Sequence, residues 1–172
     1  MGKFGFQSSR RIRVSRRFGW NSSLRAERGC TSLFAFLFLL RTQTHNQNDE
    51  YNCLTLCSGS LNANPNNNVA DIVRKYCDRI AFAHIRNVKH FENGDFSEAS
   101  HRDCDGDTGI LDILKAYHDC GFEGYIRPDH GRHLWTEGPG NVRPGYGLYD
   151  RALGIMYMLG VWDMLDKLEE EK

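Results

Sequence analysis

The sequence predicts an α/β fold in which short parallel strands alternate with helices, and three observations support this prediction. Three apolar runs have the length of buried strands, at residues 54–57, 80–84 and 125–127. A segment with helical periodicity follows each run. A potential metal ligand also stands at or just beyond the carboxyl end of each run, where parallel α/β folds place binding groups. Strand, helix and strand at this spacing form βα units with right-handed crossovers.

Charge is distributed unevenly along the 172 residues, although the formal net charge is zero. Residues 1–45 contain nine Lys or Arg and a single acid, Glu27. We therefore treat residues 1–50 as a basic, unassigned leader, disordered or misjoined, and residues 51–172 as the α/β domain. A secretion signal, an organelle transit peptide and a nucleic-acid arm are the alternatives for the leader. The apolar octet at 33–40 is shorter than the ~20 residues that cross a bilayer. We expect no membrane or nucleic-acid partner.

The six cysteines lie at positions 30, 53, 57, 77, 104 and 120, without a paired CxxC motif. This scatter predicts reduced thiols in a cytoplasmic protein. Cys77 and Cys120 fall in or at the end of predicted helices, as core or surface residues and not as ligands.

The helices follow from capping residues and apolar periodicity. An Asn-rich loop at 61–68 leads into the first helix, and Asp107 is the predicted N-cap of the second, which Gly121 closes. The intervening segment 88–109 has no period and is predicted to be a functional loop or lid. The last helix begins near Tyr146. The expected apolar faces are Val69, Ile72, Val73 and Tyr76 in the first helix, Ile110, Ile113, Leu114 and Tyr117 in the second, and Ala152, Ile155, Met156, Leu159, Trp162 and Leu165 in the third.

Three ligand types stand where the predicted strands end: the thiol of Cys57, the imidazole of His84 and the carboxylate of Asp129. Parallel neighbouring strands would bring them to one point. This mixture of soft and hard ligands suits a divalent transition metal such as Mn, Fe, Co or Zn. Three protein ligands leave coordination positions open, as a catalytic site requires.

Four stretches in order, LTLCSGSL, FAHIRNVK, YIRPDHGR and RPGYGLYDRALG, resemble the mannonate dehydratase family of the bacterial hexuronate pathway. The resemblance covers about residues 50–165. It implies the C-terminal portion, about strands six to eight, of a (β/α)8 TIM barrel, incomplete as a barrel because a full one takes about 250 residues. It also implies metal-dependent dehydration of D-mannonate to 2-keto-3-deoxy-D-gluconate, with Mn²⁺ as the metal and Fe²⁺ or Co²⁺ as alternatives.

The resemblance also implies roles for individual residues. Cys57, His84 and Asp129 match three of the four metal ligands of the family. His130 and Tyr146 match the residues that transfer protons, and which of them is the acid and which the base stays open.

Arg86 and Asn87 follow ligand His84 directly and are candidates for binding the carboxylate and hydroxyls of the sugar acid. The fourth ligand of the family is a His expected one βα unit before Cys57. No His precedes His45, which is too near Cys57 to come from the preceding strand. Activity of this chain is therefore expected to be impaired. A non-catalytic remnant or interaction module, and a sugar isomerase or epimerase on the same barrel, are the alternative functions; a homo-oligomer stays open.

Overall fold

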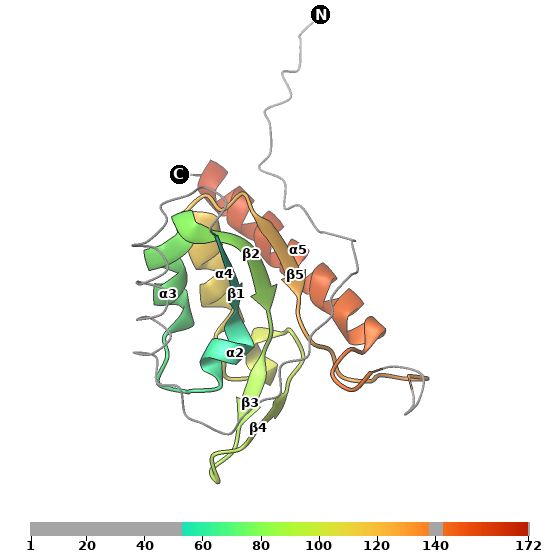
Figure 1. Ribbon diagram of the computed structural model, residues 1–172. Helices are drawn as coiled ribbons and strands as arrows, with labels where there is room; N and C mark the ends of the chain where they lie inside the picture. The colour runs from blue at the N-terminus through green and yellow to red at the C-terminus, as the bar shows by residue number, and fades with distance from the viewer. Residues whose placement is uncertain (1–52, 138–142, 172) are drawn as a thin grey trace, which may run out of the picture.

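The computed structural model describes residues 53–137 and 143–171, which form a parallel three-stranded sheet with helices packed on one face (Figure 1). The strands are β1 (Leu54–Cys57), β2 (Ile80–Ile85) and β5 (Tyr125–Pro128), in the order β1-β2-β5. All three predicted strands and their parallel pairing are confirmed. The described residues close no barrel, so the sheet is an open α/β layer.

Strand register separates the two faces of this sheet. Leu56, Ala83 and Ile126 pair across the three strands and are all buried. The next position along each strand points to the opposite face. On that face, Cys57 pairs with His84, and His84 pairs with Arg127. The register thus sets a row of polar side chains on the face that the helices of the described residues leave uncovered.

Three helices cover the apolar face: α3 (Val69–Tyr76), α4 (Ile110–Asp119) and α5 (Leu148–Glu170). Asn68 caps α3, because its Oδ1 accepts a hydrogen bond from the Asp71 N–H at 3.1 Å. Gly121 follows α4 with φ of 66°, the left-handed conformation that often ends helices. The apolar faces predicted for α3 and α4 join the core. Its members from these helices include Val69, Ile72, Val73, Ile110, Ile113, Leu114 and Tyr117.

These connections differ from the sequence prediction in two places. A short helix, α2 (Ser58–Asn62), begins directly after β1 and includes the first two residues of the expected loop at 61–68. The N-cap of α4 is Gly109, with φ of 72°, and the prediction of Asp107 was wrong. The Asp107 carboxylate instead accepts hydrogen bonds from the Lys89 ammonium at 2.6 Å and the His90 N–H at 2.8 Å.

The segment 88–109 is more regular than its sequence indicated. It contains an antiparallel hairpin of β3 (Val88–His90) and β4 (Phe96–Glu98), followed by the 3-10 turn η2 (Asp103–Asp105). The hairpin extends from the carboxyl end of β2 (Figure 1). Strands of three residues are too short to show a period in sequence, which explains the missed prediction.

The buried side of α5 was predicted only in part. Trp162 and Met158 are buried, whereas Met156 is 67% exposed and Ala152 is also exposed. The inward positions follow a spacing of four residues through Asp150, Gly154, Met158 and Trp162. The predicted stripe was therefore rotated relative to the real one, because apolar residues occur on both sides of this helix.

Cys77 and Cys120 form a disulfide that joins the turn η1 (Cys77–Arg79) to the end of α4, with their Cα atoms 6.5 Å apart. The prediction of reduced thiols was wrong for this pair, since helix packing brings together two residues 43 apart in sequence. Among the described residues, no helix is long and apolar enough to cross a membrane. The leader assigned to residues 1–50 lies outside the described residues.

Candidate metal centre

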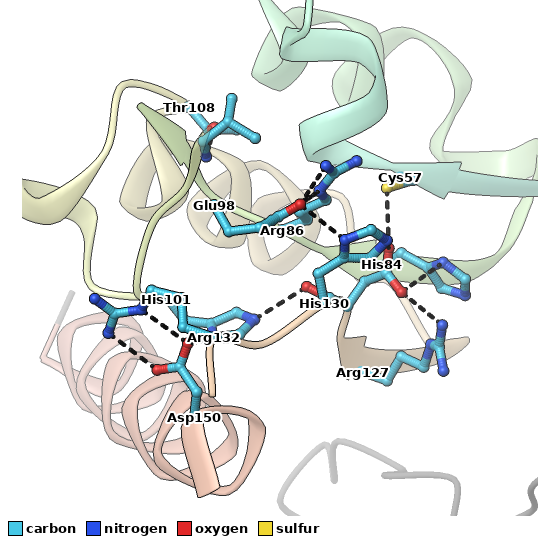
Figure 2. A network of polar contacts seen from close by, with 12 residues as sticks. Cys57, His84, Arg86, Glu98, His101, Thr108, Arg127, His130, Arg132 and Asp150 are labelled. Carbon is cyan, nitrogen blue, oxygen red and sulfur yellow. Dashed lines mark hydrogen bonds and ion pairs between the residues drawn. The ribbon is translucent and has the colours of Figure 1, made fainter. Parts of the chain in front are cut away.

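Cys57, His84 and Asp129 meet at the carboxyl end of the sheet, on the face that the described helices leave uncovered. Figure 2 labels Cys57 and His84 at this point. One ligand atom from each residue lies within 4.8 Å of the others. The Cys57 thiol donates a hydrogen bond to Asp129 Oδ2 at 3.4 Å, and His84 Nδ1 lies 3.6 Å from Asp129 Oδ1. The convergence predicted from three separate strand ends is thus present.

Backbone and side-chain contacts hold Asp129 in place. The Asp129 N–H donates to the Ile85 carbonyl at 2.7 Å, which continues the pairing of β2 and β5 beyond the end of the strand. His101 is buried, and its Nε2 lies 3.3 Å from the Asp129 carbonyl oxygen. Arg127 donates to Asp129 Oδ1 at 2.6 Å. The carboxylate is therefore fixed from the backbone and from the side chain.

The two acidic groups of this cluster have pKa values shifted in opposite directions. Burial and the neighbouring Asp129 charge raise the pKa of the Cys57 thiol. Burial alone would raise the pKa of Asp129 too, but His84, His130 and Arg127 lower it well below its usual range. A carboxylate therefore faces a protonated thiol. A bound divalent cation would lower the pKa of Cys57 instead, because a thiol that coordinates a metal loses its proton.

An unpartnered nitrogen provides a second indication of fit. The Nε2 atom of His84 is buried and has no hydrogen-bond partner among the described residues. Buried polar atoms rarely lack a partner, and exceptions call for an explanation such as an ion. With a thiol, an imidazole and a carboxylate in reach, the three side chains fit a divalent transition metal.

His130 lies next to the cluster, and Tyr146 lies next to His130. Their ring centroids are 5.3 Å apart, and a parallel bridge joins Gly131 to Tyr146. His130 Nε2 lies 3.9 Å from Asp129 Oδ2, the oxygen that also accepts the Cys57 hydrogen bond. The two residues expected to transfer protons therefore contact each other, and His130 is the one that adjoins the cluster.

Arg86 and Asn87 occupy different environments, although they are adjacent in sequence. Arg86 forms an ion pair with Glu98 through Nε, at 3.1 and 3.0 Å from the two carboxylate oxygens, and through Nη2. Asn87 is buried; its amide donates to the carbonyls of residues 100 and 102, and Thr108 N–H donates to its Oδ1. This geometry favours a role for Asn87 in holding the loop after β4.

Glu98 is the site residue that sequence reasoning did not assign. It lies at the end of β4, accepts from Arg86, and accepts from His130 Nδ1 at 2.8 Å. Figure 2 shows it between the side chains of Arg86 and His130. A single Glu in a segment without periodicity gives no signal in sequence, so only the hairpin geometry reveals it.

The small residues after Cys57, Ser58 and Gly59, both pack against Arg86. The Ser58 hydroxyl donates to the Arg86 carbonyl at 2.7 Å and accepts from the Arg86 N–H at 2.8 Å. A Cβ on Gly59 would lie 2.5 Å from Arg86 Cγ. Glycine is therefore needed for α2 to approach the Arg86 side chain this closely.

The family comparison agrees with this geometry. The family model of D-mannonate dehydratase (UxuA) matches residues 39–172. The chain belongs to this family. A mannonate dehydratase 1 of Halalkalibacterium halodurans is 63% identical over 112 residues, which are 65% of this chain and 30% of that protein. A mannonate dehydratase 1 of Bacillus licheniformis is 62% identical over 120 residues, covering 70% of this chain and 32% of that protein.

A solved structure supports the fold assignment. The crystal structure of mannonate dehydratase from Streptococcus suis serotype 2 superposes with a TM-score of 0.69 and 33% sequence identity. The match covers 76% of this chain and 37% of that one. The chain thus spans about a third of the length of the proteins that it matches.

Proposed function

We propose that the site residues of this chain serve the metal-dependent dehydration of D-mannonate to 2-keto-3-deoxy-D-gluconate. The observation that supports this proposal most is the cluster of Cys57, His84 and Asp129 beside the His130–Tyr146 pair. Relatives named mannonate dehydratase at 62–63% identity support the choice of substrate. We further propose that β1, β2 and β5 correspond to about strands six to eight of a (β/α)8 barrel.

The proposed metal is Mn²⁺, with Fe²⁺ or Co²⁺ as alternatives, held by Cys57, His84 and Asp129. When bound, such an ion acts as a Lewis acid towards substrate oxygens and favours the negative charge that develops next to the carboxylate. The side chains of this chain provide the ligands and, through Arg127 and the Ile85 carbonyl, hold Asp129 in position.

His130 and Tyr146 are assigned the two proton transfers. One takes the proton from the carbon next to the substrate carboxylate, and the other gives a proton to the neighbouring hydroxyl, which leaves as water. The resulting enol becomes the 2-keto product by proton rearrangement. The rings lie 5.3 Å apart, so both reach one substrate molecule. Arg86 is proposed to bind the substrate carboxylate through Nη1, and Asn87 to support the site by holding its loop.

Turnover of D-mannonate by the purified chain with Mn²⁺ tests this proposal, with formation of 2-keto-3-deoxy-D-gluconate as the readout. Because the fourth ligand of the family is unmatched and activity is expected to be impaired, we expect slow product formation from the parent and none from Cys57→Ala or His130→Asn. Glu92→Ala is the control, because Glu92 is exposed at the tip of the hairpin formed by β3 and β4. Product from ketoses and not from D-mannonate would replace this proposal with an isomerase. Metal binding without turnover of D-mannonate or of ketoses would favour the alternative of a non-catalytic remnant.

A further inference from the structure

We infer that Glu98 is a positioning residue that determines which ring nitrogen of His130 carries the proton. The inference deepens the proposed function and rests on it, because it concerns a residue that acts through a proposed proton-transfer group. It also brings the hairpin of β3 and β4 into the site, since Glu98 is the last residue of β4.

The ring of His130 is held on several sides. Its backbone has φ of 57°, a left-handed conformation that non-glycine residues adopt at an energetic cost and often at functional sites. The Tyr146 ring packs against it, and Gly145 leaves room for it: a Cβ at Gly145 would lie 3.3 Å from His130 Nδ1. The contact between Nδ1 and Glu98 Oε1, at 2.8 Å, fixes the rotation of the ring.

This rotation directs the other nitrogen towards the ligand cluster. His130 Nε2 lies 3.9 Å from Asp129 Oδ2, while Nδ1 faces Glu98. An ionised carboxylate can only accept hydrogen bonds, so the nitrogen that faces Glu98 must carry a proton. In the neutral ring, the lone pair is then at Nε2, on the side of the proposed metal centre.

Glu98 is itself kept ionised and fixed. Burial would raise its pKa, but hydrogen bonds from His130 and Arg86 and their charges lower it. Arg86 binds both carboxylate oxygens, and Ser58 bonds the Arg86 backbone on both its N–H and its carbonyl. A chain of contacts therefore runs from the end of β1 through Arg86 and Glu98 to His130.

Ring-nitrogen NMR of the full chain labelled with ¹⁵N-histidine tests the inference without requiring activity. At about pH 8, above the ordinary titration range of histidine, we expect the parent His130 to carry its proton on Nδ1. In Glu98→Ala, we expect the Nε2-protonated form to become populated. Glu98→Gln should give an intermediate mixture, because an amide can pair with either form of the ring. His130→Asn identifies the resonances, and Glu92→Ala should match the parent.

The inference is overturned if the folded Glu98 variants keep the parent tautomer. Should Glu98→Ala not fold, Glu98→Gln alone decides, since it keeps the side-chain volume. With D-mannonate, loss of the correct tautomer should lower kcat by about 10²-fold or more while KM changes little. If the parent itself has no turnover, the proposed function fails, and the NMR signals still establish or refute the role of Glu98.

Discussion

Replacing Gly59 by Ala should lower the free energy of unfolding, because the new side chain would clash with Arg86. The new Cβ would lie 2.5, 2.6 and 2.9 Å from Cγ, Cδ and Cβ of Arg86, whereas carbon atoms pack at about 3.5–4.0 Å. These atoms belong to the inner part of the side chain, so Arg86 must move by about 1 Å. That shift would lengthen the two bonds from its Nε to Glu98, now 3.0–3.1 Å, beyond hydrogen-bond range. Overpacking of this kind costs about 1–3 kcal/mol.

Gly160→Ala is the matched control, because Gly160 lies in α5 and a Cβ there meets nothing within 4 Å. Gly160→Ala should raise the free energy of unfolding by about 0.5–1 kcal/mol, because alanine loses less backbone freedom than glycine in a helix. Urea unfolding of both variants, followed by circular dichroism, measures the difference in the free energy of unfolding. We expect Gly59→Ala to be less stable than Gly160→Ala by at least about 1 kcal/mol. Equal stabilities would refute the packing argument for the glycine after Ser58.

Two further substitutions test the core and the electrostatics of the cluster. The hydroxyl of fully buried Tyr117 has no hydrogen-bond partner among the described residues. Tyr117→Phe should therefore raise the free energy of unfolding, measured in urea, by about 1 kcal/mol or more. A lower free energy of unfolding would mean that the hydroxyl is bonded. Folding lowers the pKa of Asp129, so its stabilising contribution is complete above the unfolded value and is lost as pH falls. Between about pH 5 and pH 3, the metal-free parent should therefore lose more unfolding free energy than Asp129→Asn, and equal losses would contradict this assignment.

The strands and the ligand cluster were predictable because each depends on a local pattern. Apolar runs locate β1, β2 and β5, and parallel pairing alone brings Cys57 and His84 into one row. Asp129 follows from the position of Pro128 at the end of β5. Strand ends are read directly from sequence, so a site built on three of them is visible there.

Features that depend on packing between distant segments were not predictable. The contact of Glu98 with His130 joins residues 32 apart, and the Cys77–Cys120 disulfide joins residues 43 apart. Neither has a local signal. The face of α5 was missed for another reason: apolar residues such as Leu153 and Met156 remain exposed, so periodicity alone selected the wrong side.

Metal-dependent stability measures the central claim most directly. Thermal unfolding of the chain would be followed with and without Mn²⁺, for the parent and for the Cys57→Ala/Asp129→Ala double variant. At 100 times its Kd, a metal that binds only the folded state adds about 2.7 kcal/mol to the free energy of unfolding. We predict this gain in the parent and its absence in the double variant. An equal gain in both proteins, or none in the parent, would contradict a metal centre formed by Cys57, His84 and Asp129.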